Sequence, residues 1–256
     1  MVISTKDQMK PIADTERITQ LRARVIVAKD PDALTRLRDT AIVDARSLRD
    51  SADEPSWVIR RGMLTHDRLL AMRFALDDLE LMVGRLRIPE VTEAALAAAR
   101  AELEPYDLDF PGQTGHCELE LAPLMACGLD GLAARIAERR ANLRPGEGDT
   151  DQDATLRAFA LALDGLSAMI ARAADDVASV AASAATPERR AELDALAGAC
   201  RHIAHHAPRT FLEAIQLLWF VLIGVMQAER AWLVGPGHLD RTLYPFYEAG
   251  DRESVV

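Results

Sequence analysis

Three histidines gather in the segment RHIAHHAP, at positions 202, 205 and 206. His202 and His206 are four residues apart, so on a helix they share a face and could bind one metal ion. No acidic residue stands among them as in an HExxH motif, and metal sites normally need a third and fourth ligand. The other interpretation, which we favour, is a polar cluster at a helix C-terminus, where the macrodipole favours cations. We therefore predict no metal site here and keep metal binding as an alternative.

The three cysteines offer a second kind of chemistry. Cys117 directly follows His116, but a nucleophilic Cys–His pair needs contact in space and sequence neighbours usually point apart. We interpret this pair as the entry to a turn near Gly115. Cys127 and Cys200 fall on apolar helix faces and are predicted to be small core residues.

Carboxylates cluster at Asp77, Asp78 and Glu80, where paired acids could perform acid–base catalysis. Such a group more often caps a helix end, and we favour that interpretation. The sequence holds no glycine-rich phosphate loop, no GxSxG elbow and no paired CxxC motif. We predict no cofactor.

Composition narrows the class of protein. The chain has 256 residues and a net charge of −10, and an acidic chain repels nucleic-acid backbones. Three distant cysteines exclude a disulfide framework and favour the reducing cytoplasm. The longest apolar run, 217–226, is about half of the roughly 20 residues that span a membrane. We therefore expect a cytoplasmic protein that binds neither nucleic acid nor membrane.

The elements that must position these residues are helical almost everywhere, because alanine is abundant and β-branched runs are scarce. The fold class predicted is all-α, with at most one or two short strands, one of them near 232–234. We treat residues 1–256 as a single domain with a possible subdivision near 144–150. Helices are expected at about 15–28, 31–48, 55–75, 89–104, 119–143, 153–184, 187–207 and 210–230, and 79–88 is expected to be partly extended.

The helix 210–230 is the predicted centre of the core. Thr210 and Glu213 form a capping box, in which each side chain can satisfy the backbone N–H of the other residue. From Leu217 to Met226 the helix is apolar nearly all round, and a helix without a polar face is buried on every side.

Two segments near the end of the chain, APRTFLEAIQLLWF (207–220) and GPGHLDRTLYPFYEAGD (235–251), resemble the pyruvate formate-lyase-like glycyl radical enzymes. That family carries a P-x-T-F-x-E-A-x-Q helix followed by S-x-G-R-x-D-Q-x-L-x-P-Y-Y. Three earlier segments resemble further family motifs in the same order, namely 57–70, 76–84 and 112–132. The resemblance implies helices packed as in the N-terminal part of such an enzyme, without a complete barrel.

The same resemblance sets expectations about the site. Gly235 stands where the family often has a substrate-facing serine, His238 replaces its arginine, and Asp240 is retained. His116 matches a histidine that faces the substrate in some members. The resemblance therefore implies a substrate-binding group of His116, His238 and Asp240.

The family uses a thiyl radical on a mid-chain cysteine and stores the radical on a glycine in an R-V-x-G loop. Both lie downstream of the matched segments, no cysteine here occupies the thiyl position, and no R-V-x-G occurs. We therefore predict no catalytic residue and expect a truncated or divergent homologue that is non-catalytic alone. The expected partners are a second copy, a larger barrel-containing chain or a small-molecule ligand. The alternatives are a subunit of a split glycyl radical lyase or dehydratase, and a helical metal- or ligand-binding protein.

Overall fold

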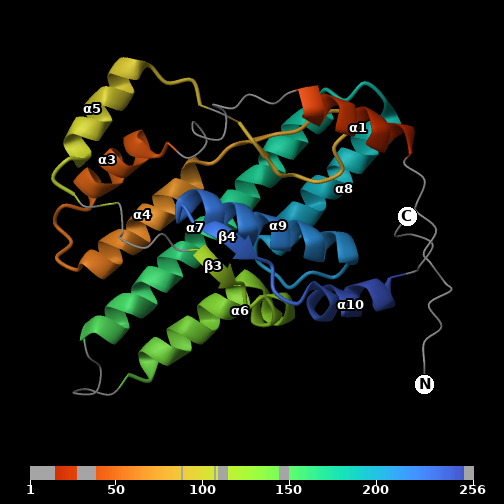
Figure 1. Ribbon diagram of the computed structural model, residues 1–256. Helices are drawn as coiled ribbons and strands as arrows, with labels where there is room; N and C mark the ends of the chain where they lie inside the picture. Colours follow the sequence, from red (N-terminus) through yellow and green to blue (C-terminus); the bar gives the residue numbers. More distant parts are fainter. Residues whose placement is uncertain are drawn as a thin grey trace.

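The computed structural model describes residues 15–27, 39–87, 89–106, 108, 115–143 and 150–250. Over these residues the chain is mainly helical, which confirms the predicted fold class, although they form four short strands where at most two were predicted (Figure 1). The expected helix start at residues 30–31 and the possible subdivision at 144–149 lie outside the described residues. The elements are α1 (Glu16–Val27), α3 (Ala41–Asp50), α4 (Trp57–Ala71), β1 (Phe74–Ala75), β2 (Arg85–Leu86), α5 (Glu93–Leu103), β3 (Gly115–Glu118), α6 (Ala122–Ala141), α7 (Thr150–Ala182), α8 (Pro187–Ile203), α9 (Phe211–Ala228), β4 (Trp232–Gly235) and α10 (Leu239–Ala249).

Hydroxyl side chains start several of these helices, as capping chemistry requires. Thr186 accepts a hydrogen bond from the backbone N–H of Arg189 and begins α8, which confirms the start predicted at that point. Thr210 likewise accepts from the backbone N–H of Glu213 at 3.2 Å. The other half of the predicted capping box is wrong, because the Glu213 carboxylate accepts from the backbone N–H of Arg209 at 2.6 Å instead.

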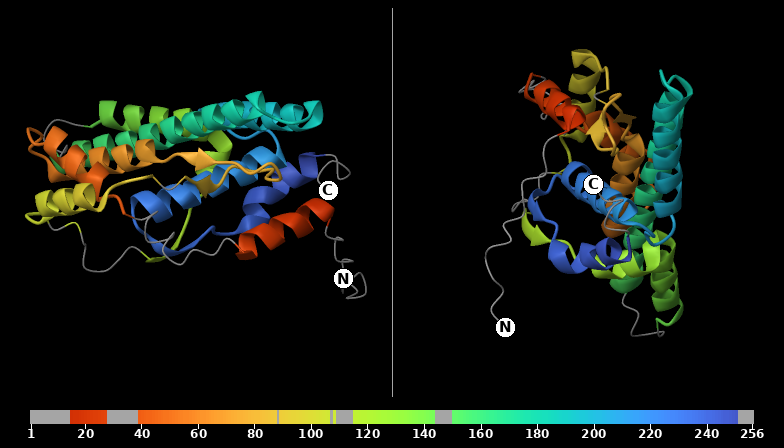
Figure 2. Two further views of the ribbon diagram at one scale, coloured as in Figure 1. Left: turned by 90° about the horizontal axis from the view of Figure 1, so that it is seen from above. Right: turned by 90° about the vertical axis from the view of Figure 1, so that its right-hand side faces the viewer.

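Helices α7 and α8 form a back layer, with α4 and α9 packed in front of it (Figure 2). The core lies between these layers, where Leu217 and Phe220 of α9 are fully buried. The ring of Phe220 meets that of Phe74 edge-on, with the two centroids 5.5 Å apart. The prediction that α9 is buried on every side is wrong, since Leu212 is 45% exposed and Trp219 is 42% exposed.

A buried amide joins α9 to the loop before β2. The Gln216 side chain accepts a hydrogen bond from the backbone N–H of Val83 and donates one to the carbonyl of Val83, both at 2.8 Å. Gln216 and Val83 are both fully buried, so each polar atom of the pair is satisfied away from water. The next residue is Gly84, where an added Cβ would come within 2.0 Å of the Trp219 indole nitrogen. These contacts give the Gln216 and 76–84 motifs a structural role.

The strands form two separate pairs. In the first, β1 and β2 are antiparallel, with Phe74 opposite Leu86. In the second, β3 and β4 are parallel although more than a hundred residues separate them in the sequence. The predicted extended piece at 79–88 is a strand only at Arg85–Leu86, and the strand expected near 232–234 is confirmed.

Helix α6 bends at Gly128, which has a φ of 69°. An added Cβ would lie 2.4 Å from the carbonyl carbon of His206, so the helix packs directly on the turn after α8. The backbone N–H of Asp130 donates to the carbonyl of His205 at 2.9 Å, which fixes the bend.

Two helical segments, Asp151–Ala182 and Phe211–Ala228, are long and apolar enough to cross a membrane by length and composition alone. Core helices pass the same test. The second segment is α9, whose inner side forms the core. The first packs against α4, α6 and α8. The expectation that the chain binds no membrane stays a prediction.

Candidate functional site

The parallel pair β3 and β4 brings the two segments with predicted site residues together. Cys117 lies opposite Val234, and Glu118 lies opposite Gly235. The carboxyl ends of both strands therefore meet at one edge, which is where open parallel sheets bind ligands.

A tight turn leaves this edge. The backbone N–H of Leu119 donates to the carbonyl of Gly235 at 3.1 Å. Gly237 has a φ of 73°, and an added Cβ would lie 2.8 Å from the carbonyl oxygen of Leu119. Glycine is therefore required at 237 for both backbone conformation and space. The turn directs the chain into α10.

The three predicted site residues lie around this sheet edge. His116 is in β3, His238 is the N-cap residue of α10, and Asp240 is in the first turn of α10. All three side chains are exposed. Within the described part of the chain, no hydrogen bond or ion pair joins them to one another, so their role in binding stays a prediction. Asp240 also has a purely structural use, because an acid in the first turn favours the helix macrodipole.

Backbone strain is concentrated here. His116 has a φ of 55° and Leu233 a φ of 54°, and the register places these two residues side by side. A bulky residue with positive φ is uncommon, and such residues gather at functional sites. Arg230, just before β4, has a φ of 53°. The sequence singled out His116 by family resemblance but not Leu233 or Arg230, since left-handed backbone at Leu or Arg has no compositional signal.

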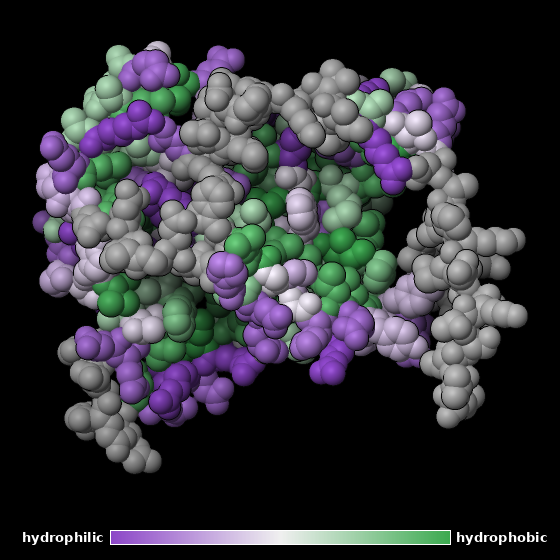
Figure 3. Space-filling view, viewed as in Figure 1, coloured by the Kyte–Doolittle hydropathy of each residue, from purple (hydrophilic) through white to green (hydrophobic). Residues whose placement is uncertain are grey.

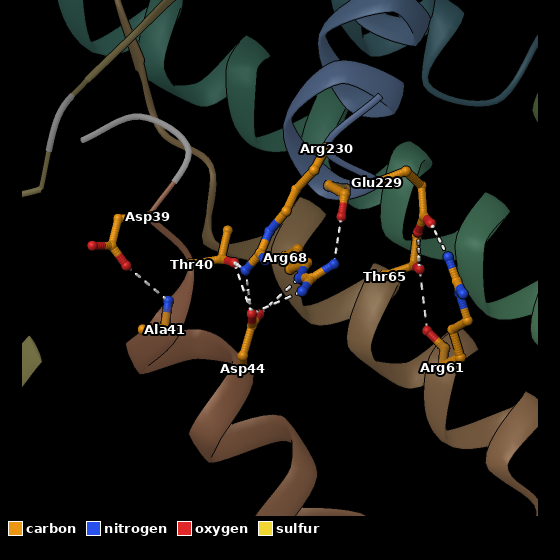
Figure 4. A network of polar contacts seen from close by, with 10 residues as sticks. Asp39, Thr40, Ala41, Asp44, Arg61, Thr65, Arg68, Glu229 and Arg230 are labelled. Atoms are coloured by element: carbon orange, nitrogen blue, oxygen red, sulfur yellow. Dashed lines mark hydrogen bonds and ion pairs between the residues drawn. The ribbon is translucent and has the colours of Figure 1, made fainter. Parts of the chain in front are cut away.

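A buried ionic network fixes the chain where it enters β4 (Figure 4). The Asp44 carboxylate is fully buried and accepts two hydrogen bonds from the Arg68 guanidinium, at 2.7 and 2.8 Å. Arg68 also donates to the carbonyl of Ala228 at 2.7 Å. Arg230 donates to Asp44 at 2.9 Å and to the Thr40 hydroxyl at 2.7 Å. Helices α3 and α4 thus hold both ends of the turn between α9 and β4.

The next residue back along the chain, Glu229, binds α4 as well. Its carboxylate accepts from the Thr65 hydroxyl and, at 3.0 Å, from Arg61. This network was also missed, although one signal was present. Asp44 lies on the same helix face as Ala41 and Leu48, and a charge on an apolar face indicates a buried ion pair.

The three cysteine thiols differ in burial and in their hydrogen bonds. Cys200 is fully buried, and burial raises the pKa of its thiol to about 12, so it carries no reactive thiolate at neutral pH. The Cys127 thiol lies 3.0 Å from the carbonyl of Pro123, to which it donates. Cys117 is half-buried in β3. The core role predicted for Cys200 is confirmed.

The side chains of the histidine cluster contact other groups of the same chain. The Nε2 atom of His202 lies 2.9 Å from the carbonyl of Ala207, and Nδ1 of His205 lies 3.1 Å from the carboxylate of Asp130. The rings of His202 and His206 are 5.1 Å apart, centroid to centroid. In the part of the chain that the structure describes, no three His, Cys, Asp or Glu residues are grouped to hold a metal.

Large apolar side chains are exposed around β4 and α10. Leu233 is 68% exposed, Tyr244 52%, and Leu239 40%. Figure 3 shows hydrophobic residues gathered over the region where Figure 1 draws α9 and β4. We call the exposed surface of Leu233, Leu239, Tyr244 and Tyr247 the β4–α10 face. Several large apolar side chains exposed on neighbouring elements are typical of an interaction site.

Comparison with known proteins defines the class. The family described as "Pyruvate formate lyase-like" matches residues 85–254, so the chain belongs to the pyruvate formate lyase-like family of glycyl radical enzymes. The chain is 36% identical over 134 residues to "Probable dehydratase YbiW" of Escherichia coli, which is 52% of this chain and 16% of that protein. It is 34% identical over 107 residues to "Trans-4-hydroxy-L-proline dehydratase" of Clostridioides difficile, which is 41% of this chain and 14% of that protein.

Solved structures show the same fold. The B12-independent glycerol dehydratase of Clostridium butyricum superposes with a TM-score of 0.77 and 18% identity, over 92% of this chain and 37% of that one. Hydroxyproline dehydratase of Clostridioides difficile gives a TM-score of 0.77 and 20% identity, over 94% of this chain and 38% of that one. The chain therefore spans well under half the length of these structures.

Proposed function

We propose that this chain is non-catalytic on its own and acts by binding a protein that completes the sheet begun by β3 and β4. One observation carries the proposal: a parallel pair of four-residue strands lies beside an exposed apolar face. Parallel strands are almost always buried on both faces within larger sheets, and an isolated two-stranded pair is marginal in water. A further strand from a partner would satisfy the sheet edge and cover Leu233.

The thiols support the non-catalytic part of the proposal. A glycyl radical enzyme needs a cysteine that can reach both the substrate and the glycyl loop in a closed, water-free site. Cys200 is enclosed in the core and Cys127 is bonded to a helix carbonyl. The sequence contains no R-V-x-G segment. Cys117, half-buried in β3, is the remaining thiol. On this proposal the thiyl cysteine and the glycyl loop belong to the partner.

The test is turnover by the purified chain under anaerobic conditions with a glycyl radical activating enzyme. We expect no EPR doublet and no consumption of a diol, a choline-like amine or a 2-oxoacid. Consumption of any of these, or a radical signal from the chain alone, would contradict the proposal. Light scattering at micromolar concentration is expected to report a dimer or larger species, because the β4–α10 face is then covered by a second copy.

A second candidate is a subunit of a split glycyl radical lyase or dehydratase. It is supported by the two named sequence relatives, a probable dehydratase and a hydroxyproline dehydratase, and by the candidate binding residues at the sheet edge. Co-expression with a chain that carries the thiyl cysteine and R-V-x-G loop should give a stable complex with an anaerobic EPR doublet. Leu233→Asp should abolish the complex, and the matched control Arg46→Asp, on exposed α3 surface, should keep it. Failure of the unaltered pair to associate would exclude this candidate.

A further inference from the structure

A concave groove lies between α6 and α7, on elements outside the proposed interface. Its volume is about 600 Å³, within the range of small-molecule sites. The groove is open, and residues on both sides of the bend at Gly128 contribute to its lining together with α7. Figure 1 shows α6 and the first half of α7 side by side. The apolar lining consists of Pro123, Leu124, Leu132, Ile136, Leu156, Phe159, Ala162 and Leu163.

The lining is unusually apolar for exposed surface. Phe159 is 56% exposed. Leu156, Phe159 and Leu163 recur at a spacing of three and four, so they share one side of α7. Leu132 and Ile136 of α6 are four apart and form the facing wall. This surface suits the apolar body of a ligand.

The polar residues of the groove indicate the charge of the ligand that it would bind. Arg135 and Arg139 are four residues apart on α6, both line the groove and both are exposed. Within the described residues, neither guanidinium has a hydrogen-bond or ion-pair partner. Their neighbour Arg140 differs, since it binds the Asp153 carboxylate at 2.8 Å. In a chain with a net charge of −10, two unpaired cations beside an apolar groove favour an anionic group.

From this geometry we propose that the α6–α7 groove binds an amphipathic organic anion, a carboxylate carried on an apolar body. The carboxylate lies between Arg135 and Arg139 and the apolar body contacts Phe159. Among the described residues, Glu120 is the one acid that lines the groove, and it disfavours a second negative group and so selects a monoanion. This inference is independent of the partner proposed for the β4–α10 face.

The test is calorimetric titration of the full chain with decanoate, below its micelle concentration. We expect one saturable site that does not bind acetate or decyltrimethylammonium, which lack the apolar body and the negative charge respectively. Arg135→Gln/Arg139→Gln should weaken decanoate binding about tenfold or more, since charge-assisted hydrogen bonds are lost. The control Arg140→Gln/Arg201→Gln removes the same charge from exposed positions outside the groove and should change the affinity less than about twofold.

Phe159→Ser tests the apolar half and should also weaken decanoate, with thermal melts confirming that each variant folds. Vesicles of phosphatidylglycerol separate a free ligand from a lipid surface, and no binding to vesicles is expected. The proposal is overturned if decanoate binds the arginine double variant as well as the unaltered chain. It is equally overturned if the cationic detergent binds with the same affinity, or if only vesicles are bound.

Discussion

The two motifs that link this chain to its family behave in opposite ways in the structure. In the TFLEAIQ segment, which begins α9, the side chains of Gln216 and Glu213 are buried and hydrogen-bonded, Gln216 with Val83 and Glu213 with Arg209. The GPGHLD segment after β4 has His238 and Asp240 exposed and without partners in the described chain. The first motif is therefore structural and complete. The second motif is held in position by the sheet, but its polar side chains have no partners within the described residues. A surface that binds a partner or ligand needs such side chains.

The largest expected effect on the free energy of unfolding is at the ionic network of Asp44, which holds the turn between α9 and β4. Asp44→Ala leaves the Arg68 and Arg230 guanidiniums without their buried carboxylate, and should lower the free energy of unfolding by about 3–5 kcal/mol. Chemical denaturation measures this change. The control Asp50→Ala, at the exposed end of α3, should change stability by less than about 0.5 kcal/mol. Equal effects at the two positions would contradict a buried network.

Gln216→Leu should be next in size. It leaves the N–H and carbonyl of Val83 buried without partners, at an expected cost of about 2–4 kcal/mol. The control is Leu212→Ala on the exposed side of the same helix, expected to cost less than about 1 kcal/mol. A denaturation midpoint for Gln216→Leu at or above that of the control would refute the structural role of this motif.

Glu213 should produce a smaller, pH-dependent effect. Burial alone would raise its pKa, but hydrogen bonds from the Arg209 side chain and backbone, with the Arg209 charge, outweigh burial and lower it. A lowered pKa means that this stabilisation is fully present above the unfolded pKa of about 4.3. It is lost as the pH falls below that value through the folded pKa.

Unfolding measured between pH 6 and pH 3 tests this expectation. Glu213→Gln should be less stable than the unaltered chain at pH 6, and the gap should narrow as the pH falls. Glu188→Gln, at an exposed first-turn position of α8, serves as the control and should keep the full acid sensitivity. A gap that is constant across the range would refute the ion-pair explanation.

The smallest effect on stability is expected at the second motif. His238→Ala and Asp240→Ala should each change the melting temperature by an amount equivalent to about 0.5 kcal/mol or less, because both side chains are exposed. If the sheet edge is a binding site, the same variants should weaken a complex with the barrel-bearing chain. If these variants strongly destabilise the chain but leave complex formation unchanged, the GPGHLD motif is structural, contrary to the comparison drawn above.

The sequence predicts the helical fold well because helix signals are local. Thr186 and Thr210 mark helix starts by side chains that act three residues away, and both are observed. The apolar stretch of α9 identified the core, but not which side of the helix is exposed. That depends on which helices pack against it, and Trp219, whose indole lies beside Gly84, remains 42% exposed.

The candidate site was less predictable, because it depends on contacts between distant residues. The pairing of Cys117 with Val234 is a tertiary event that neither short segment indicates alone. The left-handed backbone of His116 and Leu233 lies within that pairing, at opposed positions of the two strands. Family resemblance identified the segments, and the fold then placed them at one edge. The partners of Asp44 could not be predicted either, because they lie on other elements of the fold.

The hydrogen bonds between Val83 and Gln216 close a loop of 133 residues. Bringing such distant partners together costs loop-closure entropy before any contact repays it, which slows folding of a chain. During synthesis, the helices before Val83 leave the ribosome long before Gln216 exists. At about 5–20 residues per second, this interval lasts on the order of ten seconds. Through that time the backbone groups of Val83 and the ring of Phe74 lack their α9 partners, so polar and apolar groups that are buried in the folded chain stay accessible.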